Sequence, residues 1–243
     1  MADRAAPVKP EPVVLSWSGG KDSSLALAAL RADPRYEVVA LLTSITRVYD
    51  RVSVHGVRRT LVEAQAAAAG LPLVEVVLEP QSSNEAYETA FRDALARIRV
   101  AYPGVMQIAF GDLFLTDVRK YREDLVASSG FAGIFPLWGR DTRQLADEFI
   151  AAGFRAHLVC VDTTQLSATF SGRAFDAALL SDLPETVDPC GERGEFHTFV
   201  SAGPIFTAPI GVRCGDVVLR ENRFAFCDLL PDGAIVNLHG DGG

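Results

Sequence analysis

The feature that most constrains the fold is a regular alternation of apolar runs and helical segments through the first two-thirds of the chain. Short runs rich in β-branched residues predict buried strands, and apolar residues spaced three or four apart predict helix faces. The predicted strands are residues 13–15, 38–46, 73–78, 106–110 and 158–161. Parallel strands need helical crossovers, so this alternation predicts an α/β fold with a doubly wound parallel sheet. Ligands of such sheets bind beyond the carboxyl ends of the strands, so the loops that follow the strands are the places to look for chemistry.

The pattern changes after about Asp182, where proline, glycine and short β-branched runs dominate. These runs predict β-hairpins, and we expect a small C-terminal β-rich extension. The predicted organisation is a flexible lead over residues 1–11, an α/β domain over residues 12–180, and a β-rich region over residues 181–238 that completes the substrate site.

Charge and cysteine usage narrow the function classes. The chain carries 23 Lys and Arg against 31 Asp and Glu, a net charge of −8, which argues against broad nucleic-acid binding. No window approaches the roughly 20 apolar residues of a membrane span, and the N-terminus lacks the apolar core of a signal peptide. The four cysteines form no CxxC pair, so neither a zinc ribbon nor a catalytic dithiol is expected. We expect a cytoplasmic protein with reduced thiols and no membrane partner.

A glycine-rich loop, Ser18-Gly19-Gly20-Lys21-Asp22-Ser23, lies between the first predicted strand and its helix. Adjacent glycines let the backbone curl around an anion, and the helix N-terminus offers unpaired N–H groups. The serines would add hydroxyl donors and Lys21 a positive charge, whereas Asp22 would repel phosphate unless Mg²⁺ lay between them. The alternative is a glycine turn before a helix capped by Asp22 or Ser23. The loop is neither a Walker A sequence nor GxGxxG.

A second dense segment places Glu192, Glu195 and His197 within six positions, spaced by glycines. Neighbouring carboxylates can bind an amine, hold a metal or share a proton, and a histidine can act as a base. The alternative is a polar hairpin turn with its charges in water. No base stands at a sequence position that would indicate an activated Cys190 thiol, so a small buried thiol is favoured over a nucleophile.

Both segments resemble one known family. SGGKDS resembles the PP-loop of the N-type ATP pyrophosphatases, in the adenine nucleotide alpha hydrolase-like superfamily. Residues 191–198, GERGEFHT, resemble the GE-x-GE-[FY]-x-T signature of its diphthine–ammonia ligase-related members. The resemblance covers about residues 12–230, since further matching segments are His55-Gly56, Gln65-Ala66, Phe110-Gly111-Asp112, Pro136-Leu137-Trp138 and Gly172-Arg173. It implies a Rossmann-like, HUP-type fold that binds ATP and Mg²⁺. The diphthine ligases carry a glutamate where this chain has His197, so the acceptor stays open.

The resemblance also implies residue roles. The catalytic residues would be Lys21, Asp22, Glu192, Glu195 and His197, with Asp22 as the Mg²⁺ ligand. The ATP-binding residues would be Ser16, Ser18, Gly19, Gly20, Lys21, Asp22, Ser23, Ser24, Thr43, His55, Gly111 and Asp112. The substrate residues would be Arg119, Arg122, Trp138 and Thr198.

Several of these residues have a second interpretation. Lys21 could be a solvated loop lysine, His55 a structural loop histidine, and Asp112 a helix cap. Arg119 and Arg122 lie three apart on one helix face, where they could grip a carboxylate or phosphate, or pair with Glu123 or Asp124. Trp138 could form a pocket wall or belong to the core.

The predicted activity is that of an ATP-dependent, AMP-forming carbon–nitrogen ligase. It would adenylate a small-molecule or protein-borne carboxylate or carbonyl group, release pyrophosphate, and form an amide with ammonia. A tRNA-modifying PP-loop enzyme is the first alternative, although the acidic charge and missing dithiol count against it. A non-catalytic nucleotide sensor is the second, although the Glu–His segment counts against it. A homodimer is the expected assembly if the β-rich tail forms an interface.

Overall fold

The computed structural model describes residues 9–232 of the chain, and these residues form two sheets. The first sheet has the strand order β3-β2-β1-β5-β6, with β4 also paired to β2. Every pair in it is parallel except β2–β3. Its strands are β1 (Glu11–Ser16), β2 (Tyr36–Thr46), β3 (Arg51–Val52), β4 (Leu73–Leu78), β5 (Gln107–Ala109) and β6 (Ala132–Ile134).

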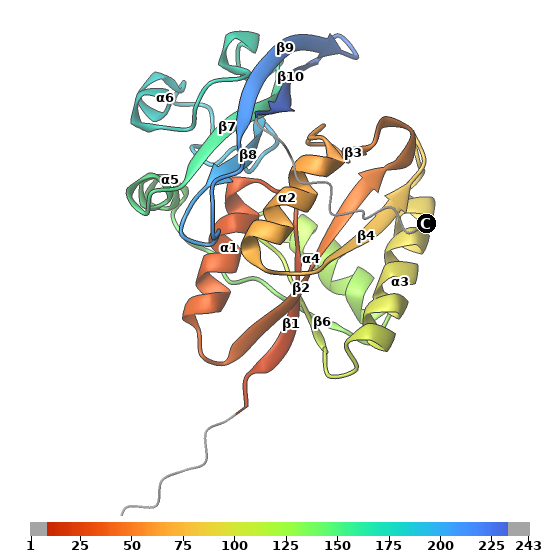
Figure 1. The fold of residues 1–243 in the computed structure, drawn as a ribbon. Coiled ribbons are helices and arrows are strands. Elements are labelled where there is room, and N and C mark those ends of the chain that lie inside the picture. The colour runs from red at the N-terminus through yellow and green to blue at the C-terminus, as the bar shows by residue number, and fades with distance from the viewer. Residues whose placement is uncertain (1–8, 233–243) are drawn as a thin grey trace, which may run out of the picture.

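Helices cover both faces of this sheet, which confirms the predicted fold class (Figure 1). The helices around this sheet are α1 (Lys21–Ala32), α2 (Arg59–Ala69), α3 (Asn84–Ala101) and α4 (Thr116–Ala127), with a short 3-10 turn η1 (Arg47–Tyr49). Helices α5 (Thr142–Ala151) and α6 (Ala177–Asp182) and the 3-10 turn η2 (Ala168–Phe170) accompany the second sheet (Figure 1). The core strand residues Val13, Val14 and Leu15 are fully buried because β1 is covered on both sides.

Local sequence sets the helix boundaries. The side chain of Ser83 caps α3 by accepting a hydrogen bond from Ala86 N, at 3.2 Å. The apolar face of α3, which includes Phe91 and Leu95, repeats every three or four residues and packs on the sheet. Helix α2 ends at Gly70, which adopts a left-handed conformation with φ of 68°.

The second sheet is antiparallel, with the order β8-β7-β10-β9. Its strands are β7 (Arg155–Asp162), β8 (Phe196–Ala202), β9 (Val212–Arg220) and β10 (Phe224–Pro231). The prediction that residues 158–161 belong to the parallel sheet is therefore wrong, because β7 pairs with β8 and β10. A continuous buried run is equally compatible with either sheet, since only long-range pairing sets strand direction.

The predicted domain boundary at residue 180 stays a prediction, whereas the change from one sheet to the other falls between Ile134 and Arg155. Strand β1 already begins at Glu11, inside the predicted lead of residues 1–11. The remainder of that lead, residues 1–8, lies outside the described residues, as do residues 233–238 of the predicted C-terminal region.

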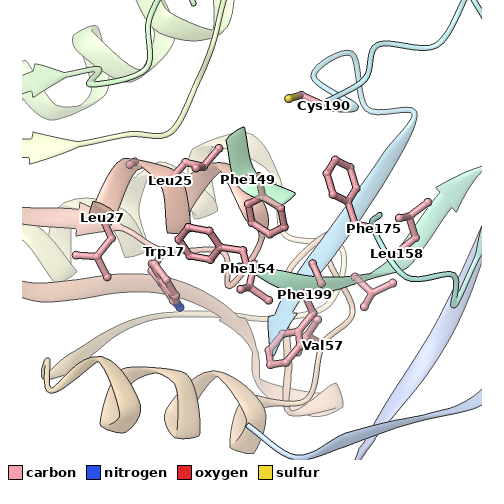
Figure 2. Close-up of a cluster of buried hydrophobic side chains, with 14 of the residues drawn as sticks. Trp17, Leu25, Leu27, Val57, Phe149, Phe154, Leu158, Phe175, Cys190 and Phe199 are labelled. Atoms are coloured by element: carbon pink, nitrogen blue, oxygen red, sulfur yellow. The ribbon is translucent and has the colours of Figure 1, made fainter. Parts of the chain in front are cut away.

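One hydrophobic core joins the two sheets. Figure 2 shows Trp17, which follows β1, and Leu25 of α1 close to Phe149, Phe154 and Phe199. All five residues belong to the same buried cluster. The rings of Phe149 and Phe154 stack with centroids 4.8 Å apart. This shared core fixes β8 against the N-terminal end of α1, where the glycine-rich loop lies. Within residues 9–232, no helix combines the length and the apolar character needed to cross a membrane.

Candidate functional site

The glycine-rich loop connects β1 to α1 and is held from two sides. Gly19 adopts φ of +79°, and a Cβ there would lie 2.6 Å from Gln65 Oε1, so only glycine fits. Gly20 precedes α1 but supplies no side-chain cap, and Thr198 of β8 supplies it instead. Lys21 N donates to Thr198 Oγ1 over 3.0 Å. The first backbone N–H of α1 is therefore capped by a side chain 177 positions away in the sequence.

Gln65 of α2 braces this loop, although it was not among the predicted site residues. It is fully buried, its Oε1 accepts from Trp17 Nε1 at 3.0 Å, and its Nε2 donates to Gly19 O at 2.9 Å and Val200 O at 2.6 Å. Gln65-Ala66 was a matching segment of the family resemblance, which was the one signal for it in the sequence.

The serines of the loop have different surroundings. Ser23 and Ser24 donate their hydroxyl hydrogens to Gly20 O, at 3.0 and 2.9 Å. Ser18 Oγ accepts from Gly20 N at 3.2 Å and lies 3.3 Å from Ser23 Oγ. Ser16, Ser18 and Ser23 line the cleft described below, whereas Ser24 does not.

Lys21 is a buried cation, not a solvated loop lysine. Only 2% of it is exposed, and its ammonium donates to both Asp22 carboxylate oxygens at 2.8 Å and to the Cys190 carbonyl. The rings of Phe175 and Phe196 flank it at 6.0 and 5.8 Å. Burial alone would lower the pKa of Lys21, but the negative charge of Asp22 raises it above its usual value. Lys21 therefore stays charged.

A two-chambered cleft opens at the carboxyl ends of β1, β2 and β5, where ligands bind in open α/β sheets. The chambers measure about 570 and 210 Å³. The smaller chamber lies over the glycine-rich loop and also contacts Gly111, Asp112 and Glu192. Both chambers share Ser16, Ser18, His55, Arg122 and His197, so these five residues form the junction.

The smaller chamber is rich in carboxyl groups. Burial raises the pKa of Asp22, Asp112 and Glu192, in the last case to about 7. Repulsion from Asp22 and Asp112 adds to the effect on Glu192, whereas a hydrogen bond of 2.7 Å from Leu113 N opposes it. Because these carboxyls repel one another when ionised, a cation bound in this chamber would favour their ionised forms.

This chamber suits Mg²⁺ carried by a polyphosphate. Magnesium favours one or two carboxylates plus phosphate oxygens and water over an all-protein cage. Residues 9–232 contain no cluster of three or more His, Cys, Asp or Glu arranged to hold a metal alone. Asp22 and Asp112 both line the small chamber and supply such carboxylates.

The rings of His55 and His197 contact each other at the junction in a tilted arrangement, with centroids 4.5 Å apart and planes at 39°. Burial and the other ring lower the pKa of His55 well below its usual value, and burial lowers that of His197 to about 4. Both rings are therefore neutral at physiological pH, and His55 Nδ1 has no hydrogen-bond partner within the described chain. Both residues line the two chambers, and each neutral imidazole has one donor and one acceptor nitrogen.

The loop that carries His55 is fastened to β10. Arg51 and Arg58 flank the loop and both reach the Asp228 carboxylate, at 2.9 and 2.6 Å. Gly56 packs so closely on Phe226 that an added Cβ would lie 2.7 Å from the ring. The second sheet thus positions one histidine through this loop and the other through β8.

Of the two predicted arginines, Arg122 lies at the cleft and Arg119 lies elsewhere. Arg122 lines both chambers, and its buried Nε makes no hydrogen bond to any residue of the described range 9–232, with Asp112 Oδ2 at 3.8 Å. Arg119 instead pairs with Glu123 at 2.8 Å and stacks over Trp138 at 4.7 Å. The structure therefore places Arg119 and Trp138 outside both chambers.

Four further predicted site residues line neither chamber, namely Glu195, Thr43, Gly19 and Ser24. Glu195 is buried, and its carboxylate accepts from Asp188 N and Arg193 N, both at 2.9 Å, so it braces its own loop. Thr43 is buried with an unpartnered Oγ1, while its neighbours Leu42 and Ser44 line the larger chamber. Successive residues of a strand face opposite sides, which accounts for the difference.

Helices α3 and α4 contribute residues that the sequence analysis missed. Asn84, Tyr87, Asp117 and Tyr121 line the larger chamber. Each lies in the first two turns of a helix that follows a parallel strand, which was the available signal. Cys190 is a buried thiol, as predicted, and burial raises its pKa to about 12.

Comparison with known proteins adds to this geometry. A model of the diphthamide synthase N-terminal domain matches residues 12–132, and a model of the diphthamide synthase C-terminal domain matches residues 141–228. The chain is also similar to the diphthine–ammonia ligase of Schizosaccharomyces pombe, with 25% identity over 218 residues. The match covers 83% of this chain and 36% of the yeast protein, so the chain spans about a third of that relative's length.

Proposed function

This chain belongs to the PP-loop diphthine–ammonia ligase-related family, and on that premise we propose that it is an ATP-dependent carbon–nitrogen ligase. It adenylates a carboxylate acceptor, releases pyrophosphate, and transfers the acyl group to ammonia with release of AMP. We propose ammonia as the nitrogen donor because the similar Schizosaccharomyces pombe protein is a diphthine–ammonia ligase. We propose a protein-borne or small-molecule carboxylate as acceptor and a cytoplasmic location.

One observation supports this proposal above the others. The N-terminal end of α1 opens into a small, carboxyl-lined chamber that is continuous with a chamber of about 570 Å³. Unpaired N–H groups and the positive end of the helix dipole favour a polyphosphate at such a point. The larger chamber has the volume of a small-molecule site, so the cleft can hold two reactants next to each other.

In the adenylation step, an acceptor carboxylate oxygen attacks the α-phosphorus and the bond to the β-phosphate breaks. The leaving pyrophosphate carries the negative charge, and the loop N–H groups with the fixed charge of Lys21 stabilise it. Asp22 and Asp112 would hold Mg²⁺ against the phosphate oxygens, where the ion would neutralise charge. Arg122 at the junction, with its unpaired Nε, orients the acceptor carboxylate.

In the second step, ammonia attacks the acyl carbon and the bond to AMP breaks. The new amide nitrogen must lose one proton, and Glu192 is the carboxylate suited to accept it. It lines the small chamber, and its pKa of about 7 lies near the working pH. His55 and His197, both neutral, can donate hydrogen bonds at the junction without competing for that proton.

Acceptor-dependent exchange of labelled pyrophosphate into ATP tests the proposal. Lys21→Ala and Asp22→Ala should each lower the exchange rate at least about 100-fold, since each removes charge from the transition state. Lys120→Ala and Asp124→Ala form a matched control, because that ion pair is exposed on α4 and neither residue lines a chamber. Full exchange by both loop variants would contradict the site assignment.

Two binding measurements, made beside the exchange assay, separate the other function classes. ATP binding without exchange, across a panel of carboxylate acceptors, would favour a nucleotide sensor. Tight tRNA binding that weakens steeply with salt would favour a tRNA-modifying enzyme.

A further inference from the structure

Two cysteines lie next to each other in the second sheet. Cys214 belongs to β9 and Cys227 to β10, and the pairing of these strands places Cys214 opposite Leu229 and Cys227 opposite Val217. Cys227 and Leu229 are two residues apart on β10, so they point to the same face of the sheet, and their partners on β9 share that face. The two cysteines are therefore diagonal neighbours across one strand pair.

The sulfur atoms of this pair meet at Gly172, which adopts φ of +84°. A Cβ built on Gly172 would lie 3.1 Å from Cys227 Sγ and 3.8 Å from Cys214 Sγ. Cys214 Sγ also donates to Gly172 O over 3.3 Å. One point of the structure thus lies next to both sulfurs, and rotation about the Cα–Cβ bonds can bring them together.

The two thiols differ in their access to solvent. Cys214 is exposed, whereas only 5% of Cys227 is exposed, so oxidants in solution reach Cys214 first. Burial raises the pKa of Cys227 to about 12, and the Cys214 thiol adds to this shift, so Cys227 is inert on its own. An exposed cysteine beside a protected one is the arrangement of a redox-responsive pair, in which the protected thiol reacts with the oxidised sulfur.

Cys227 lies between the two residues that hold the His55 loop (residues 51–58). Successive residues of a strand face opposite sides, so Phe226 and Asp228 point away from the face that carries Cys227. The ring of Phe226 packs against Gly56 of this loop, and the Asp228 carboxylate pairs with an arginine at each end of it. A displacement of β10 at Cys227 therefore reaches both contacts of the loop.

We propose that Cys214 and Cys227 form a reversible disulfide that loosens the His55 loop when the protein is oxidised. The Cys214 sulfur attacks hydrogen peroxide, the O–O bond breaks, and a sulfenic acid and one water result. The Cys227 sulfur then attacks the Cys214 sulfur, the S–O bond breaks, and the Cys227 proton leaves with the hydroxyl group as a second water. The two thiols lose two electrons, which the peroxide gains. Small thiols can attack the exposed Cys214 sulfur and reverse the reaction.

Peptide mapping of the full chain tests the bond. Trypsin cleaves after arginine, so Cys214 falls in peptide 214–220 and Cys227 in peptide 224–243. After treatment with hydrogen peroxide and alkylation of the remaining thiols, mass spectrometry should find these two peptides joined, lighter than their sum by the mass of two hydrogen atoms. Dithiothreitol should separate them. The buried Cys160 and Cys190 are the internal control and should be recovered as alkylated thiols.

Hydrogen–deuterium exchange of the same samples tests the effect on the His55 loop. Amide exchange in residues 51–58 should be at least about fivefold faster in the oxidised chain, because Phe226 and Asp228 hold the loop less firmly. Exchange in α3 should be unchanged. Cys214→Ser, treated with peroxide in the same way, should show neither the cross-link nor the faster exchange. Neither measurement depends on ATP turnover.

Two sets of results would overturn the proposal. Oxidation of Cys214 to a sulfinic acid without a cross-link, or a disulfide between two chains, would show that Cys227 is not its partner. A complete cross-link with unchanged exchange in residues 51–58 would show that the bond does not act on the His55 loop.

Discussion

Glu192 combines burial, a fixed hydrogen bond and neighbouring carboxyls in one side chain. Because its pKa is about 7, it is protonated in acid and becomes a carboxylate as the pH rises through neutrality. The shift also has a stability consequence. The native state holds this proton more tightly than the unfolded chain, so the stabilisation is complete below the usual glutamate pKa and is lost as the pH rises through about 7.

The first prediction concerns the pH dependence of amide formation. The rate should rise with pH through an apparent pKa of about 7 if the Glu192 carboxylate accepts the proton. Glu192→Gln should lower the rate about 100-fold or more and remove this limb of the profile. The measurement is the amide-forming rate between pH 5.5 and 8.5 at a constant concentration of free ammonia, because ammonium also loses its proton as the pH rises. ATP binding is the control for folding. If the rate of the variant still rose with pH through the same apparent pKa, Glu192 would be excluded as the proton acceptor.

A second residue-scale prediction concerns the brace under the loop. Gln65→Ala leaves the buried Trp17 Nε1 and the Val200 carbonyl without this partner, so the free energy of unfolding should fall by about 3 kcal/mol. Urea denaturation measures the change. Gln144→Ala, at an exposed position of α5, should change it by less than about 0.5 kcal/mol. Equal effects of the two substitutions would show that the brace contributes little.

At the scale of elements, α1 depends on β8 for its cap. Thr198→Val keeps the side-chain shape but removes the oxygen that accepts from Lys21 N, which should cost about 1 kcal/mol of stability. Because this cap holds the N-terminal end of α1 in place beside the small chamber, ATP affinity should fall as well. Thr198→Ser keeps the acceptor and should retain both properties. The measurements are urea denaturation and calorimetric titration with ATP, and an unaffected valine variant would refute the role of this cap.

The elements that sequence could predict are those with local causes. The strand–loop–helix around Gly19 and Gly20 was predictable because glycine spacing and helix periodicity are encoded within a few residues. The direction of β7 was not, because a fully buried strand carries no signal for its partner. A parallel sheet was therefore predicted for a strand that the structure pairs antiparallel.

Side-chain direction within the site was equally hard to predict. Arg119 and Arg122 share a helix face, yet only Arg122 lines the cleft, because Glu123 and the aromatic rings hold Arg119. Glu195 seemed equivalent to Glu192 in the signature, but its carboxylate closes onto N–H groups of its own loop. Such outcomes depend on long-range packing that residue spacing does not encode.

At the scale of the whole molecule, the two sheets share one core, although separate family models match the N- and C-terminal parts. The shared core predicts a single cooperative unfolding transition. Phe199→Ala should lower stability by about 3–5 kcal/mol without splitting that transition, because Phe199 lies in the cluster between the layers. Circular dichroism and tryptophan fluorescence followed together in urea give the test. Two separate transitions in the wild-type chain would contradict a shared core.

The central claim is that this cleft cleaves ATP between the α- and β-phosphates in order to activate a carboxylate. The most direct measurement is product analysis of ATP turnover with Mg²⁺, ammonium and a fractionated metabolite and protein extract, resolving AMP from ADP. The account predicts AMP and pyrophosphate in equal amounts, dependent on an extract fraction and lost in Lys21→Ala. ADP and inorganic phosphate as the products would contradict it.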